Sequence, residues 1–237
     1  VGKSTLARAL ACEASVNGWS VKLADLDTQQ GTVADWHRIR LANDHEPVGS
    51  VEVFAKAANA LATSDDYDLL ILDGSARASE ATGAMAKHSD LTVIPTCASR
   101  DDLVPAIRLA HEFKKAGVPT GDIVLALTRV TTQAEIEAAR EFITESGYHA
   151  LAGCLYEKPA YRQAQNEGLA VTETRYRSLN DKASKLLQSL VDKLTAGSWS
   201  NSGNRLRSRR TALARRLPLM RRARRWSSRS MRRRNQR

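Results

Sequence analysis

The first five residues, VGKST, match the second half of the phosphate-binding pattern G-x-x-x-x-G-K-[ST]. In such a loop, backbone N–H groups around a glycine such as Gly2 point at phosphate, and the helix that follows adds its dipole. Lys3 would reach the β- and γ-phosphates of a nucleotide, and the Ser4 hydroxyl would hold Mg²⁺. Thr5 follows as the first helical turn forms. Alone, a G-K-S tripeptide also fits a helix that begins there by chance.

Two acidic strand ends give this motif a context. The run VKLADLD ends in Asp25 and Asp27, and the run DLLILD ends in Asp73. A hydrophobic run that ends in Asp beside a phosphate loop is the Walker B arrangement, in which the carboxylate holds Mg²⁺, often through water. One such acid also fits a solvated strand end or a helix cap. Three elements of this kind at the carboxyl ends of strands, where open α/β sheets bind ligands, predict a nucleotide site.

The elements that must position these residues are short apolar runs that alternate with amphipathic stretches. Near-continuous apolar runs are typical of strands buried on both faces of a sheet. Alternation at this spacing predicts right-handed βαβ units and an α/β fold, in which a mostly parallel sheet has helices on both faces. The expected strands are 21–27, 51–55, 68–73, 91–96, 123–130 and 150–156, and the expected helices are 4–16, 32–43, 101–116, 133–147 and 177–195.

The net charge of +10 is concentrated at the end of the chain. Residues 201–237 hold 15 arginines and no acidic residue, so residues 1–200 hold 21 basic and 26 acidic residues. We therefore expect three regions. A folded nucleotide-binding domain occupies 1–195, a polar linker occupies 196–204, and an arginine-rich, disordered tail occupies 205–237.

Three interpretations of this tail stay open. In the first, its arginines contact DNA phosphates without regard to base sequence. The arginines assigned to such contacts are Arg205, Arg207, Arg209 and Arg210. In the second, the tail is a solvated extension without a specific role. In the third, it results from translation in a shifted frame, because G·C-rich DNA read out of frame often yields arginine-rich strings.

Residue types argue against several other classes of protein. Cys12, Cys97 and Cys154 lie far apart and form no C-x-x-C pair, which fits reduced thiols in the cytoplasm and argues against a disulfide framework or a zinc site. The five histidines show no metal-ligand spacing. No apolar run approaches membrane-spanning length and no signal-peptide pattern is present, so we expect no membrane partner.

Six segments, taken in order, resemble the ParA/MinD family of P-loop ATPases. VGKSTLARALA resembles the end of the deviant P-loop K-G-G-x-G-K-[ST]-[ST], and VKLADLDTQQGTVADWHRIR resembles the D-x-D-x-Q motif with its following Trp. DYDLLILDGSA is similar to the Walker B segment, and VIPTCASRDDLVPAIRLAHEF, LALTRV and YEKPAYRQAQNEGLAVTE are similar to later segments. The resemblance covers about residues 1–195, the nucleotide-binding domain that CobQ, CobB, MinD and ParA proteins share.

The resemblance implies a dimeric, Mg²⁺-dependent ATPase that positions plasmids, chromosomes, division sites or other cargo, with ATP and Mg²⁺ as cofactors. Gly2, Lys3, Ser4 and Thr5 would bind ATP. Ser4 and Asp73 would hold the metal ion. All of these roles belong to the first and third motifs of the resemblance.

The resemblance also implies roles in hydrolysis. Asp27, the second acid of D-x-D, would help to position the attacking water, with Asp25 supporting this switch and Lys3 on the phosphates. Positioning and charge stabilisation provide most of the catalysis in phosphoryl transfer. Thr128 stands where most members have an Asn near the adenine.

This sequence departs from the family pattern at two further places. The family's first lysine and first strand would precede Val1, so we expect a fragment that lacks that strand and half of the P-loop, with activity expected of the complete protein. After Asp73 the chain reads Gly-Ser-Ala where the family has Thr-Pro-Gly or a close variant, so the second switch differs.

The leading hypothesis is a cytoplasmic, nucleoid-associated partition ATPase. ATP binding would make a homodimer that holds DNA nonspecifically, and hydrolysis, stimulated by a ParB-like adaptor, would release it. The alternatives are a MinD-like or conjugation-associated positioning ATPase, an amidotransferring biosynthetic ligase with the same nucleotide domain, and a non-enzymatic remnant whose basic tail binds DNA.

Overall fold

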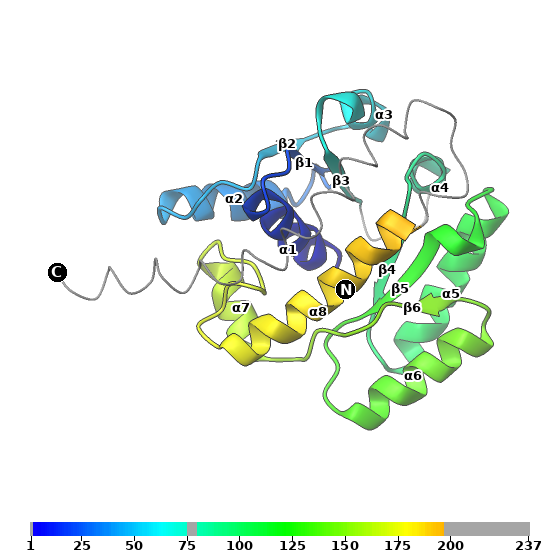
Figure 1. Cartoon of the computed structure of the whole chain (residues 1–237). Coiled ribbons are helices and arrows are strands. Elements are labelled where there is room, and N and C mark those ends of the chain that lie inside the picture. Colours follow the sequence, from blue (N-terminus) through cyan, green and yellow to red (C-terminus); the bar gives the residue numbers. More distant parts are fainter. Residues whose placement is uncertain (1, 75–79, 197–237) are drawn as a thin grey trace.

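The computed structural model describes residues 2–74 and 80–196, in which parallel strands alternate with helices (Figure 1). The strands are β1 (Val21–Asp25), β2 (Ser50–Val53), β3 (Leu69–Asp73), β4 (Thr92–Thr96), β5 (Ile123–Leu127) and β6 (His149–Ala150). They form two three-stranded parallel sheets, in the orders β2-β1-β3 and β4-β5-β6.

The helices of the described residues include those expected from periodicity and three shorter ones. They are α1 (Lys3–Val16), α2 (Thr32–Ala42), α3 (Ala57–Leu61), α4 (Glu80–Lys87), α5 (Arg100–Lys115), α6 (Gln133–Glu145), α7 (Pro159–Asn166) and α8 (Arg177–Ala196). The sequence analysis missed α3, α4 and α7, because five to eight residues are too few for a helical apolar period to stand out.

Helices cover both faces of the sheets, as the buried strand β5 shows. Its alternate side chains Ile123, Leu125 and Leu127 join a core that contains residues of α5 and α6. Val124 and Ala126 join the opposite core, which contains residues of α1 and α8. All five are at most 1% exposed. The expected α/β fold with parallel strands and helices on both faces is therefore confirmed.

The core around α1 holds the two sheets together. It contains Leu6 and Leu10 of α1, Ile71 of β3 and Leu186 of α8, in addition to the two side chains of β5. In Figure 1, α1 (dark blue) and α8 (yellow to orange) lie side by side. Because both sheets bury side chains against the same pair of helices, the helices fix how the sheets sit relative to each other.

The expected parallel strands form two ladders, because β3 and β4 share none among the described residues. One expectation about the strands needs correction. The strand expected at 150–156 is reduced to the two-residue β6, because Gly153 has a φ of 84° and interrupts the extended chain. Leu151 and Leu155 still donate backbone hydrogen bonds to β5, at 2.8 and 3.0 Å.

Several sequence expectations lie outside the described residues. They include the tail at 205–237 with its four assigned arginines, and the linker at 196–204 apart from Ala196, which ends α8. The division of the chain into these regions stays a prediction. Within 2–74 and 80–196, no helix is long and apolar enough to cross a bilayer.

Gly153 provides a test of how tightly α8 is held. A Cβ at Gly153 would lie 2.8 Å from the backbone nitrogen of Leu186, whereas one at Gly147, whose φ of 81° is similar, would meet no atom within 4 Å. Gly147→Ala should cost about 1 kcal/mol of unfolding free energy through left-handed strain alone. Gly153→Ala should cost about 1–3 kcal/mol more, because overpacking adds to the same strain. Urea unfolding measures the difference, and equal losses would mean that α8 yields at this contact.

Candidate nucleotide-binding site

The site is built at the N-terminus of α1. Gly2 is the N-cap with a φ of 89°, a backbone conformation that glycine adopts readily, and its carbonyl accepts the N–H of Leu6 at 3.0 Å. Lys3 and Ser4 begin the helix and are half-buried. The first turn has no acidic residue, and no side chain of the described residues caps it. Its N–H groups therefore lack helical partners, an arrangement that favours phosphate.

The opening motif meets the acid at the end of β3. Asp73 is 4% exposed, and burial raises the pKa of its carboxyl group above the usual range. A hydrogen bond from the Ser4 hydroxyl lowers this pKa, the charge of Asp25 raises it, and the charges of Lys3 and Arg8 lower it. Ser4, Lys3 and Asp25, predicted from separate motifs, and the further residue Arg8 therefore surround one carboxylate.

Asp25 occupies the neighbouring position on β1 and is fully buried. One carboxylate oxygen accepts the N–H of Asp27 at 3.0 Å. The other accepts the N–H groups of Val33 and Ala34, at 2.9 and 3.3 Å, in the first turn of α2. Asp25 therefore fixes both ends of the loop that links β1 to α2.

Asp27 lies in that loop and is half-buried. Its carboxylate accepts the N–H of Gln30 at 3.2 Å, and its carbonyl accepts the N–H of Gly31 at 2.8 Å. The loop ends beside the phosphate motif, since the Thr32 hydroxyl lies 3.4 Å from the Ser4 hydroxyl. The geometry thus brings Asp27's loop to the start of α1, while the water-positioning role of Asp27 stays a prediction.

Two other predicted residues, Thr128 and Thr5, have hydroxyl groups that donate hydrogen bonds within the protein. Thr128 is 1% exposed, and its hydroxyl donates to the carbonyl of Thr96 at 3.3 Å. It lies directly against Gly2, because a Cβ on that glycine would be 3.1 Å from the Thr128 hydroxyl. The Thr5 hydroxyl donates to Gln165 of α7 at 3.0 Å. Contacts of Thr128 with a base and of Thr5 with phosphate stay predictions.

Arg8 is a site residue that the sequence analysis missed. Its guanidinium donates to the carbonyl of Thr32 at 2.6 Å and lies 5.5 Å from the centre of the Trp36 ring. Burial lowers the pKa of Arg8, and the charges of Asp73 and Asp25 oppose that shift. The signal was present in the sequence, because Arg8 follows Ser4 by four residues and so shares its face of the helix.

The donors at this site fit Mg²⁺. Ser4 and Asp73 supply a hydroxyl and a carboxylate, and Mg²⁺ commonly takes one or two carboxylates and completes its shell with substrate phosphates and water. Within the described residues, no group of three or more His, Cys, Asp or Glu side chains is placed to hold a metal ion without such phosphates. A hard, phosphate-linked cation is therefore the kind of metal these residues suit.

Comparisons with known proteins give the fold but no sequence relative. No family model matches the sequence, and no curated protein matches it. The cell division ATPase MinD of Pyrococcus furiosus has a TM-score of 0.64 and 17% identity, over 81% of this chain and 93% of its own. MinD of Pyrococcus horikoshii, complexed with Mg-ADP, has a TM-score of 0.63 and 17% identity, over 80% and 90%.

A third structure comes from Borrelia burgdorferi, a protein assigned to plasmid partition and bound to AMPPNP. It has a TM-score of 0.61 and 17% identity, over 81% of this chain and 94% of its own. At these identities the comparisons establish the fold alone. The chain has the fold of ParA/MinD-type P-loop ATPases, which confirms the resemblance at the level of structure.

The buried carboxylate of Asp73 predicts a stability cost at neutral pH. Because its folded pKa is raised, stability is fully present below the unfolded pKa of about 4 and is lost as pH rises through the folded value. Asp73→Asn should therefore raise the melting temperature of the nucleotide-free protein at pH 7, each 1 kcal/mol appearing as about 2–4 °C. The gain should shrink as pH falls toward 4. Calorimetry measures it, and a lower melting temperature at pH 7 would show instead that the Ser4–Asp73 hydrogen bond dominates.

Proposed function

We propose that the protein is a Mg²⁺-dependent ATPase that partitions plasmid or chromosomal DNA through ATP-dependent dimerisation and nonspecific DNA binding. One observation carries the proposal. Lys3, Ser4 and Arg8 of α1 meet Asp73 of β3 and Asp25 of β1 at an uncapped helix N-terminus. Two acids, two cations and free N–H groups at the carboxyl ends of parallel strands suit a metal–nucleotide.

The residues divide the work of phosphoryl transfer. Lys3 and the first N–H groups of α1 hold the phosphates, and Ser4 and Asp73 hold Mg²⁺, which when bound neutralises charge on the phosphate oxygens. Asp27 orients the attacking water from the loop that Asp25 fixes. This assignment needs only positioning and electrostatics, the two effects that dominate such reactions.

Known structures support the cofactor part of the proposal. The Pyrococcus horikoshii MinD is complexed with Mg-ADP, and the Borrelia burgdorferi protein is bound to AMPPNP. These ligands belong to those proteins. We assign ATP and Mg²⁺ to this chain because it shares the fold of those proteins and because of the site residues described above.

The proposal also names the cargo that the ATPase positions. We favour DNA, held on the nucleoid in the cytoplasm and released when a ParB-like adaptor stimulates hydrolysis. A positioning ATPase for another cargo is the second candidate, because structures with this fold include proteins of cell division as well as one assigned to plasmid partition. DNA binding by a dimer that forms only with ATP separates the two.

Three substitutions in the full-length protein test the site. Lys3→Ala and Asp73→Ala should abolish ATP-dependent dimerisation, because they remove the phosphate and metal contacts. Asp27→Ala should retain ATP and accumulate as dimer, with kcat lowered about 10²-fold or more, because it loses water positioning more than binding. Light scattering with ATP and a phosphate-release assay measure both properties.

A matched control is available on α2. Asp35 is an exposed acid that pairs only with Arg38 in the surface contacts described, at 2.9 Å, so Asp35→Ala should leave dimerisation and hydrolysis unchanged. If Asp27→Ala instead stays monomeric under saturating ATP, Asp27 belongs to the binding site and its assignment to water is wrong.

The arginine-rich tail gives a separate prediction about DNA. Any binding contributed by residues 205–237 should be nonspecific, and about six phosphate contacts would lose roughly a thousandfold in affinity between 50 and 200 mM salt. Removing 205–237 should leave ATP-dependent DNA binding in place, since the proposal assigns that property to the folded dimer. Filter binding with and without ATP tests this, and loss of DNA binding with intact ATPase activity would assign it to the tail.

A further inference from the structure

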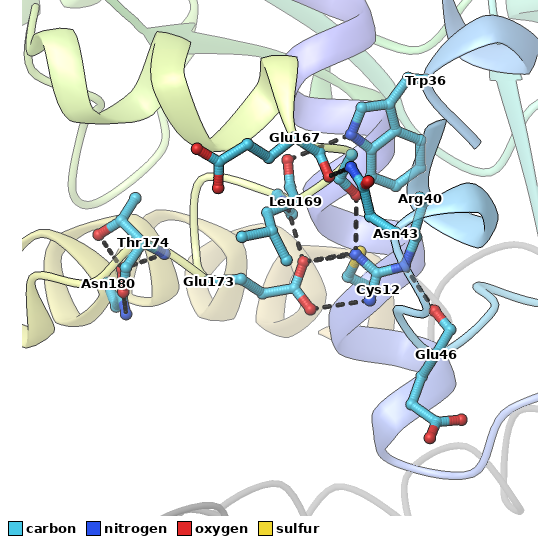
Figure 2. Close-up of polar contacts among 12 residues, drawn as sticks. Cys12, Trp36, Arg40, Asn43, Glu46, Glu167, Leu169, Glu173, Thr174 and Asn180 are labelled. Atoms are coloured by element: carbon cyan, nitrogen blue, oxygen red, sulfur yellow. Dashed lines mark hydrogen bonds and ion pairs between the residues drawn. The ribbon is translucent and has the colours of Figure 1, made fainter. Parts of the chain in front are cut away.

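The far end of α2 is held by an ion pair between the buried Arg40 and the half-buried Glu173, which the proposed reaction does not use. Arg40 is 3% exposed and donates to both carboxylate oxygens of Glu173, at 2.7 and 2.9 Å (Figure 2). Glu173 belongs to the segment between α7 and α8, more than 130 residues along the chain. The pair therefore links α2, the helix that follows the loop carrying Asp27, to a distant part of the sequence.

Both partners make further hydrogen bonds. Arg40 also donates to the carbonyls of Gly168, at 3.0 Å, and Glu46. Glu173 also accepts the N–H of Ala170 at 2.7 Å and lies 3.7 Å from the Cys12 thiol. Burial and the charge of Glu173 raise the pKa of Cys12 well above its usual range, so it stays a neutral donor. The Arg40 guanidinium is therefore bonded to three separate places in the chain, Glu46, Gly168 and Glu173.

The same segment follows α2 along its length. The Trp36 ring nitrogen donates to the carbonyl of Leu169 at 3.1 Å, and the Asn43 side chain donates to the carbonyl of Glu167 at 3.0 Å (Figure 2). Gly168 lies against the helix backbone, since a Cβ there would be 2.4 Å from the Cα of Arg40. The contact leaves no room for α2 to slide.

The near end of α2 is joined to the site. Arg8 donates to the Thr32 carbonyl, and Asp25 accepts the N–H groups of the first turn. Arg40 follows Thr32 by eight residues, about 12 Å along a rigid helix. A shift at the ion pair is therefore transmitted to the loop that carries Asp27.

We propose that Arg40 and Glu173 are positioning residues, which fix α2 and thereby hold the loop from Leu26 to Gly31 in its hydrolysis-competent conformation. The effect on catalysis rests on the ATPase proposed above, whereas the effect on the loop does not. Loss of the pair should lower kcat about 10- to 100-fold, as small displacements of a catalytic group do, with KM for ATP nearly unchanged.

The decisive variant removes both charges together. Replacing a buried ion pair by apolar side chains often leaves stability unchanged or higher, so the double variant Arg40→Met/Glu173→Met should fold. In the absence of nucleotide, hydrogen exchange at the amides of Asp27 and Gly31 should become faster than in the unmodified protein. A purely structural pair would leave a folded double variant with unaltered loop exchange and unaltered kcat, which would overturn the proposal.

Two single variants complete the experiment. Arg40→Lys keeps the charge and loses the forked hydrogen bonds, so its loop exchange and kcat should fall between those of the unmodified protein and the double variant. Arg38→Ala, on the exposed face of the same helix, should change neither. If the double variant fails to fold, Arg40→Lys decides, and normal loop exchange in that variant counts against the proposal.

The loop and hydrolysis measurements also separate this inference from the proposed function. If the unmodified protein shows no ATPase activity but the double variant shows faster loop exchange, the ATPase assignment fails and the control of the loop by Arg40 and Glu173 stands. If ATPase activity is present and the loop exchange of the double variant is normal, the ATPase assignment stands and the control of the loop by Arg40 and Glu173 is wrong.

Discussion

Two acidic side chains end neighbouring parallel strands in register, and the burial of both carboxylates is the constraint around which the site is arranged. Asp25 and Asp73 are both nearly inaccessible to water, where like charges interact strongly. Asp25 is stabilised by three backbone N–H groups, one from Asp27 in the following loop and two at the start of α2. Asp73 has the Ser4 hydroxyl and the nearby charges of Lys3 and Arg8. Each acid is therefore placed at the N-terminus of a different helix.

This constraint explains which parts of the site could be predicted from the sequence. A strand that ends in Asp and a lysine in a G-K-S motif are local signals, and the parallel fold brings their ends together without further information. Gln165 and the Arg40–Glu173 pair were missed because their partners come from distant segments, which periodicity and motif spacing do not record. Arg8 could have been found from its spacing, since it lies one helical turn after Ser4. The sequence shows which residues are present but does not show which distant residues contact each other.

The elements of the fold could also be predicted from local sequence patterns, whereas their tertiary contacts could not. Apolar runs located β1 to β5 and the five long helices, because apolar periodicity differs clearly between strands and helices, even for β2, which is partly exposed. The predicted end of the last strand, at residue 156, was wrong because Gly153 adopts a left-handed conformation. At this glycine α8 packs closely, and no local sequence pattern reveals such a tertiary contact. The division between β3 and β4 is likewise a matter of pairing, which strand patterns do not specify.

The position of α1 has a consequence for the lifetime of the protein. This helix begins at the phosphate motif, and its apolar face lies in the core that both sheets share. A ligand at its N-terminus would stabilise a helix whose core also contains side chains of both sheets. Binding at 100 times the dissociation constant adds about 2.7 kcal/mol to the folded state. Under the proposed function, bound nucleotide would therefore make the opening of the chain to proteases rarer.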